Sequence, residues 1–154
     1  MITLQAYWMG RDVKYAASLT AEIKRNGPET VRRVNLLLQL YKEDTGRDVD
    51  KVSSGWRPPA VNDETSNAAL TSNHLLAAAV DVVDELRQFA AWCVLNPSKL
   101  AACGLWVEDP RWTPTWVHLQ IVPPRSGKRI YIPSTAPQKA PALSGQKPIP
   151  MTVK

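Results

Sequence analysis

The sequence predicts an α+β domain in which a small, mainly antiparallel sheet has helices packed against it. Apolar residues recur at helical spacing in the first third of the chain, whereas they alternate with polar residues in the segment that ends at Ile121. Between these parts, short apolar runs that suit strands are mixed with short helical segments. Helices that come first, followed by strands and helices in mixture, are typical of the α+β class.

Apolar spacing and turn residues give the expected helices. Val34, Leu38 and Tyr41 belong to an apolar stripe in a helix that begins at Pro28, and Asn26-Gly27 separates it from a shorter helix. Four helices are expected, at 16–25, 28–44, 85–95 and 97–103. Cys93 and Cys103 lie in the last two, too far apart for a C-x-x-C pair. We expect two small buried hydrophobic side chains, with a disulfide as the alternative.

The expected strands are short and are bounded by turn residues. The first, Val52 to Trp56, is stopped by Pro58-Pro59 and followed by a polar loop from Val61 to Ser72. The others are expected at 79–83, 105–108, 116–121 and 129–132. A turn-rich segment joins 105–108 to 116–121, which predicts an antiparallel hairpin with a long connection.

The compact domain, residues 1–132, is expected to end near Ile132. Seven of the thirteen prolines lie between Pro123 and Pro150, so residues 133–154 are expected to form an extended or disordered basic tail. Residues 125–154 contain six basic residues and no acid, whereas residues 1–124 contain thirteen basic and fourteen acidic residues, so the net charge of +5 belongs to the end of the chain. Because these charges are dispersed among prolines, we expect no nucleic-acid partner.

Membrane and export classes are excluded by the apolar pattern. The uncharged stretch from Ala68 to Val80 is interrupted by Ser, Asn and His, so no membrane-spanning segment is expected. The N-terminus lacks the basic and then apolar regions of a signal peptide, so we expect synthesis in the cytoplasm without Sec-type export. A chain of 154 residues can bury a sufficient core without oligomerisation, and a monomer is expected.

The strand at 116–121 presents one of the two histidines of the chain. Alternation places Trp116, His118 and Gln120 on one face, and the aliphatic residues between them on the other. The aliphatic face must lie in the core. His118 is therefore expected to point towards a cleft on the opposite face.

The other histidine, His74, precedes a buried carboxylate by seven residues. Asp81 lies inside the apolar strand 79–83, where a carboxylate is costly unless a cation pairs with it. Together with His118, these residues suit zinc, because three protein ligands leave a fourth position for water. Taken singly, each histidine could be a surface or hydrogen-bonded residue, and Asp81 could pair with an arginine.

Three segments together resemble the M15 family of zinc peptidases, which contains D-alanyl-D-alanine carboxypeptidases, L-alanyl-D-glutamate endopeptidases and many bacteriophage lysins. The family motifs are S-G-[WY]-R, S-x-H-x-x-G-x-A-x-D and a strand with a second histidine. The matching segments are Ser54-Gly55-Trp56-Arg57, Ser72-x-His74-x-x-Ala77-x-Ala79-x-Asp81 and Trp116-Val117-His118. The resemblance runs from about Ser53 to Gln120.

This resemblance implies a site and an activity. His74, Asp81 and His118 would be the zinc ligands, Arg57 would bind the scissile carbonyl or a substrate carboxylate, and Ser72 would orient a carboxylate or the loop. The implied fold is like that of Hedgehog and D,D-peptidase domains, with the zinc cleft on one face of the sheet. The implied substrate is a peptidoglycan stem peptide, cleaved at or near D-alanine by a phage lysin or a virion component.

The chain departs from the family pattern at two positions. Ala77 replaces a glycine, a change that a helical backbone would tolerate and a positive φ would not. Thr115 stands three residues before the second histidine, where many members have an acidic general base. Across the expected hairpin, Glu108 would lie diagonally from His118, which makes it the candidate base, whereas Asp109 suits an Asx turn before Pro110.

Two further interpretations stay open beside the enzyme. Thr115 favours a non-catalytic module of the same fold that contains zinc and binds cell wall or serves as a virion structural part. A nucleic-acid-binding protein acting through its tail is the weakest of the three. The sequence also leaves open whether the enzyme would be a carboxypeptidase, which needs a closed pocket, or an endopeptidase, which needs an open groove.

Overall fold

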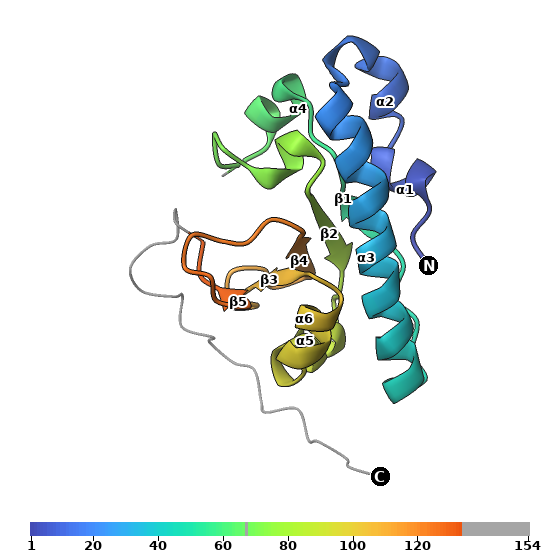
Figure 1. Ribbon diagram of the computed structural model, residues 1–154, viewed down its shortest axis with the longest axis vertical. Coiled ribbons are helices and arrows are strands. Elements are labelled where there is room, and N and C mark those ends of the chain that lie inside the picture. The colour runs from blue at the N-terminus through green and yellow to red at the C-terminus, as the bar shows by residue number, and fades with distance from the viewer. Residues whose placement is uncertain (67, 134–154) are drawn as a thin grey trace.

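A computed structural model describes residues 1–66 and 68–133 and has the predicted α+β class (Figure 1). The helices are α1 Leu4–Trp8, α2 Arg11–Lys14, α3 Ala21–Thr45, α4 Pro59–Glu64, α5 Gln88–Leu95 and α6 Pro97–Ala102, with 3₁₀ turns η1 Ala16–Ser18 and η2 Asn73–Leu76. The strands are β1 Val52–Ser54, β2 Ala79–Val83, β3 Trp106–Glu108, β4 Trp116–Gln120 and β5 Ile130–Tyr131. The tail predicted for 133–154 lies outside the described residues, apart from Pro133.

The sheet is mixed but mainly antiparallel. Its strand order is β1-β2-β4-β3-β5, in which the first three pairings are antiparallel and β3 pairs with β5 in parallel. The predicted hairpin between β3 and β4 is confirmed. In the central pair, Asp81 of β2 lies opposite His118 of β4. The topology therefore brings these two side chains to the middle of one face.

Residues 21–45 form one helix, so the two separate helices predicted around Asn26-Gly27-Pro28 are wrong. Tertiary contacts stabilise the helix at the residues that were expected to end it. The Asn26 side chain donates to the Leu76 carbonyl, and Trp8 packs so closely on Gly27 that a methyl group there would overlap its indole. Buried residues continue across the proline, with Ile23 before it and Val31 after it. Tertiary burial thus outweighs the local preference for a break.

The core lies between α3, α5, α6 and the aliphatic face of the sheet (Figure 1). Val117 and Leu119 of β4 are buried there, as the alternation predicted. Cys93 and Cys103 are free and buried, which confirms their interpretation as small hydrophobic side chains. No helix among residues 1–66 and 68–133 is long and apolar enough to cross a membrane.

Three other boundaries differ from the prediction. The first strand ends at Ser54, and the chain then passes the N-terminal helices, where Arg11 of α2 donates to the Trp56 carbonyl at 2.7 Å. The loop predicted from 61 contains most of α4, whose Pro59 occupies a favoured first helical position. The helix predicted from Glu85 begins at Gln88, because the Asp84 carboxylate accepts the backbone N–H groups that open α5.

The N-terminal helices α1 and α2 were not predicted. The α1 helix is short, and it is capped by Thr3, whose hydroxyl accepts from Ala6 N. It packs against the sheet through Tyr7, which is fully buried and donates to the Ala79 carbonyl at 3.1 Å.

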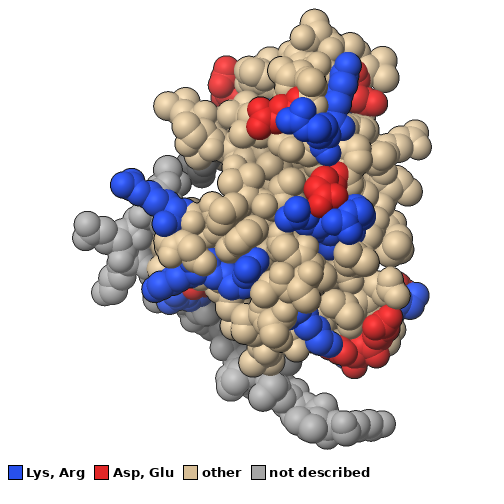
Figure 2. Space-filling model, in the orientation of Figure 1, with Lys and Arg blue, Asp and Glu red and all other residues tan. Residues whose placement is uncertain are grey.

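Charges of both signs are interspersed on the face shown in Figure 2. Among the described residues, Glu29 pairs with Arg32 and Arg33, and Lys42 pairs with Asp48. The absence of a nucleic-acid partner stays a prediction.

Candidate metal centre

A cleft of about 900 Å³ lies over the polar face of the sheet. Residues from all five strands line it. The register pairs Ser54 with Asp81, Asp81 with His118, and Glu108 with Tyr131. Loop residues at 68–73 and 124–126 line it as well. The cleft is therefore an open groove with a polar floor, and His74 and Arg57 contribute to its lining.

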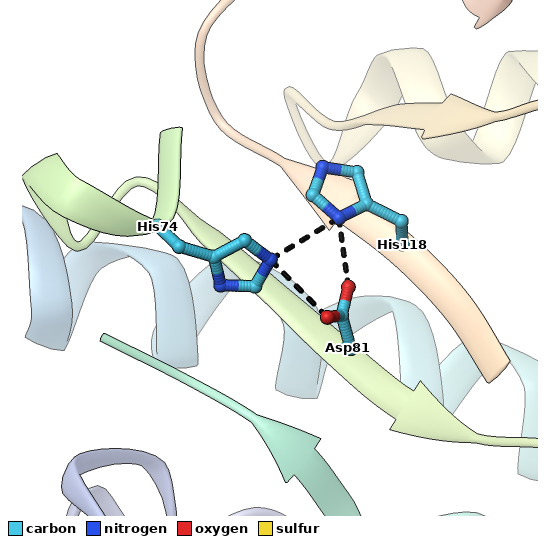
Figure 3. Close-up of side chains that lie close together, drawn as sticks. All are labelled: His74, Asp81 and His118. Carbon is cyan, nitrogen blue, oxygen red and sulfur yellow. Dashed lines mark hydrogen bonds and ion pairs between the residues drawn. The ribbon is translucent and has the colours of Figure 1, made fainter. Parts of the chain in front are cut away.

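His74 enters the cleft from η2, beside the sheet (Figure 3). The Ser72 hydroxyl accepts from His74 N at 3.3 Å, so Ser72 caps the turn that carries the histidine. The imidazole is fully buried, and its Nδ1 lies 2.6 Å from the carbonyl oxygen of Gly55. Because a carbonyl can only accept, Nδ1 carries the proton and Nε2 offers its lone pair to the centre of the cluster.

His74, Asp81 and His118 converge at the distances expected of metal ligands (Figure 3). His74 Nε2 lies 3.3 Å from both His118 Nδ1 and Asp81 Oδ2, and His118 Nδ1 lies 2.7 Å from Asp81 Oδ1. Ligands at 2.0–2.1 Å from a tetrahedral zinc are separated by about 3.3 Å. The three residues could therefore hold a metal ion with only a small adjustment of the shortest pair.

Burial and charge together set the protonation of this cluster. Burial raises the pKa of Asp81, but its interactions with His74 and His118 outweigh this effect and keep that pKa well below its usual value. Burial lowers the pKa of His74, which stays below the ordinary value. Burial also opposes a charge on His118, but its hydrogen bond to Asp81 outweighs this and raises the pKa of His118. Without a metal, the hydrogen bond between these two residues therefore has its proton on His118 Nδ1 and an ionised Asp81 as acceptor.

Arg57 lies beside the cluster, in the segment that follows the end of β1. Its backbone N–H donates to the His74 carbonyl at 3.0 Å, and this bond joins the two motif segments. The side chain is buried, its Nη2 lies 3.4 Å from Asp81 Oδ2, and its Nε has no partner among the described residues. The guanidinium therefore keeps donor capacity next to the ligand cluster.

Glu108 lies in the same cleft, at the end of β3. The register pairs Trp106 with Gln120 and Val107 with Leu119, so Glu108 follows the last pair on β3 and His118 precedes it on β4. Burial raises the pKa of Glu108 above its ordinary value, and repulsion from Asp81 adds to this effect. Such a carboxylate can exchange a proton nearer neutral pH than an exposed one.

Asp109 and Thr115 are not placed to act as the general base. Asp109 accepts from the backbone N–H and guanidinium of Arg111, as expected of an Asx turn, and its carboxylate is not among the groups that line the cleft. Thr115 is exposed, and its backbone carbonyl accepts from Asp84 N.

Ala77 adopts the left-handed conformation, with φ of 54°. The helical backbone that would tolerate this alanine is therefore not present. The residue ends η2, and the Thr30 hydroxyl donates to its carbonyl at 2.9 Å. The strain of about 1–2 kcal/mol is thus held by buried contacts next to His74.

The supporting residues predicted on β4 lie in the cleft. Trp116 is partly buried at the strand end, and Gln120 is 3% exposed. Sequence reasoning missed the neighbours that hold the ligands: the Gly55 carbonyl, Asn73 and Tyr131. Alternation along the short last strand could indicate which face of the sheet Tyr131 occupies. Its contact with Gln120, however, depends on a strand register that the sequence does not specify.

Comparison of the chain with protein-family models, curated proteins and solved structures yields no match. The site is therefore described by its own geometry: a two-histidine, one-carboxylate cluster in an open cleft, with an arginine and a second carboxylate beside it.

Proposed function

We propose that this protein is a zinc-dependent peptidase that hydrolyses peptidoglycan stem peptides at or near D-alanine, in keeping with its resemblance to the M15 peptidases and to the Hedgehog-like fold. One observation carries the proposal. His74, Asp81 and His118 come from a 3₁₀ turn and two strands, yet their ligand atoms all lie within 4.8 Å of one another. The two motif segments that supply these residues, 72–81 and 116–118, thus meet at one point.

The donor set fits zinc. Two imidazole nitrogens and one carboxylate oxygen are the donor set of a catalytic zinc site, which leaves a fourth position open for water or substrate. The three residues line the cleft, so a substrate could reach that position. Each histidine also has an acceptor at its outer nitrogen, Gly55 O for His74 and Gln120 Oε1 for His118. Such partners orient ligating imidazoles in known zinc sites.

The proposed reaction divides the work among three side chains. When bound, zinc supplies Lewis acidity that polarises the scissile carbonyl and favours deprotonation of water. Glu108 accepts a proton from the attacking water and delivers it to the amine nitrogen that leaves as the C–N bond breaks. Arg57 donates from its guanidinium to the carbonyl oxygen as negative charge develops there. His74, Asp81 and His118 would hold the zinc.

The open cleft favours a peptide substrate that passes through the site over one that enters only by its end. The groove has loop residues along its sides and polar groups on its floor, so a stem peptide could extend in both directions from the cluster. A phage lysin or virion component would meet such peptides in the cell wall.

The test is hydrolysis of purified peptidoglycan by zinc-loaded protein, followed through new amino groups and released D-alanine. The matched control is Glu108→Gln, which keeps the size of the side chain but cannot accept the proton. Turnover by the wild type and not by the variant supports the peptidase. Zinc binding without turnover by the wild type would contradict it and favour a cell-wall-binding module, the alternative that Thr115 suggests.

A further inference from the structure

We infer that Gln120 is a positioning residue that holds His118 with its proton on Nε2, so that Nδ1 faces the metal. The inference rests on the proposed metal centre and goes beyond it, because it assigns opposite ring nitrogens to the two histidines. His74 presents Nε2 to the cluster and donates from Nδ1, whereas His118 presents Nδ1 and directs Nε2 away. The structure places an acceptor at each outer nitrogen.

The orientation of the Gln120 amide is fixed by its neighbours. Its Nε2 donates to the Val122 carbonyl at 2.6 Å. Because a carbonyl oxygen can only accept, the amide nitrogen and not the amide oxygen must face Val122. Its Oε1 therefore faces the site, where it accepts from Tyr131 Oη at 2.6 Å and from Asn73 Nδ2 at 2.9 Å. An amide flip would set the Gln120 nitrogen against the Asn73 donor and the Gln120 oxygen against the Val122 carbonyl oxygen.

The Gln120 oxygen is the acceptor nearest the outer face of His118. His118 Nε2 lies 3.4 Å from Gln120 Oε1, on the opposite side of the ring from Asp81. A proton on Nε2 is thus directed at a fixed acceptor. The alternative, with Nε2 towards the metal, would put the proton on Nδ1 and leave Gln120 Oε1 without a hydrogen bond from His118.

Three elements meet at this one oxygen. Asn73 comes from η2, next to His74, Gln120 comes from β4, and Tyr131 comes from β5. Gln120 and Tyr131 are 3% and 8% exposed, so little solvent competes for these bonds. The network links the two ligand-bearing segments through groups that do not touch the metal position, which is the arrangement expected of residues that act through a ligand.

The chain has only two histidines, which makes the inference directly measurable. In zinc-loaded protein labelled with ¹⁵N-histidine, long-range ¹H–¹⁵N correlation identifies the protonated nitrogen of each ring. We expect opposite tautomers: His74 protonated on Nδ1, and His118 protonated on Nε2. Zinc held through Nε2 of His118 would overturn the inference alone, whereas a wild-type protein that binds no zinc would overturn the metal centre and the inference with it.

Gln120→Met tests the role of the amide, because it keeps much of the side-chain volume and removes the acceptor. We expect zinc affinity to fall roughly 10- to 100-fold and the His118 tautomer to become mixed, while His74 is unchanged. Gln120→Glu restores acceptor oxygens and is expected to restore the wild-type His118 spectrum. The control is Thr113→Val, which removes a buried hydroxyl that lines the cleft without contacting His118.

Tyr131→Phe provides a second variant in case Gln120→Met does not fold. Removal of one hydroxyl loosens Gln120 without deleting its oxygen, so we expect a few-fold loss of zinc affinity and faster solvent exchange of the His118 Nε2 proton. Affinity and exchange equal to the wild type in the variants that fold would overturn the positioning role.

Discussion

Substitution of Gly55 by alanine is expected to damage both the fold and the metal centre, because Gly55 is in contact with α1 on one side and His74 on the other. A methyl group built on Gly55 would overlap the backbone oxygen of Tyr7 and lie 2.8 Å from its carbonyl carbon. The obstacle is backbone, so no side-chain rotation relieves it. The carbonyl of Gly55 is also the acceptor for His74 Nδ1.

The loss of stability expected for Gly55→Ala follows from the displacement that it would impose on α1. The α1 helix would have to retreat by roughly 1 Å or more to restore van der Waals contact, but Tyr7 is fully buried and hydrogen-bonded to Ala79 O. Over-packing of a core costs about 1–3 kcal/mol, and a backbone obstacle belongs at the upper end. We therefore expect Gly55→Ala to lower the free energy of unfolding by about 3 kcal/mol. A displaced Gly55 carbonyl should weaken zinc binding roughly 10- to 100-fold.

The assay is urea denaturation in the presence of a chelator, so that metal binding does not contribute to stability, with zinc affinity measured separately by competition. Gly46→Ala is the control: Gly46 has φ of 72° and open space around it, so the cost is backbone strain of about 1–2 kcal/mol with unchanged zinc affinity. Wild-type stability and wild-type zinc affinity in Gly55→Ala would refute the packing described for α1 and His74.

Three further predictions concern the chemistry of the site. Glu108→Gln should retain zinc and stability while kcat falls roughly 100-fold or more, and wild-type turnover in this variant would exclude Glu108 as the base. Arg57→Lys keeps a charge near Asp81 but loses the planar fork, so kcat/KM should fall about 10- to 100-fold at unchanged zinc content; equal kinetics would exclude a role for the guanidinium. The hydrogen bond to Asp81 overcomes burial and raises the pKa of His118 above its ordinary 6.5, so zinc must displace a proton from His118. Zinc affinity should therefore fall by up to about tenfold per pH unit on acidification, beginning above pH 6.5. Competition titrations at several pH values check this, and a flat profile would contradict it.

Local patterns predicted the parts of the fold where one physical effect dominates. Alternation along β4 placed His118 and Gln120 opposite Val117 and Leu119, because burial of the aliphatic face leaves only one register of side chains. The break expected at Gly27 failed, since packing against Trp8 compensates for a poor helical sequence.

The sequence predicted the three residues that converge and some of their neighbours, Ser72 and Gln120 among them, but not the other groups that hold them in place. His74, Asp81 and His118 stand out by residue type and spacing, whereas the Gly55 carbonyl belongs to the backbone and has no signature of its own. Glu108 was expected diagonally from His118 because a long connection leaves the hairpin register open, and packing of β3 between β4 and β5 sets it. The position of Tyr131 in the cleft depends on the same pairing of β3 with β5.

The central claim is a single zinc site built from both histidines, and metal stoichiometry tests it most directly. Purified wild-type protein, equilibrated with zinc and then freed of excess metal, should contain one zinc per chain. His74→Ala and His118→Ala should each lose nearly all of it, because each removes one of three ligands. Stoichiometric zinc in either variant, or no zinc in the wild type under conditions where the protein is folded, would contradict the account.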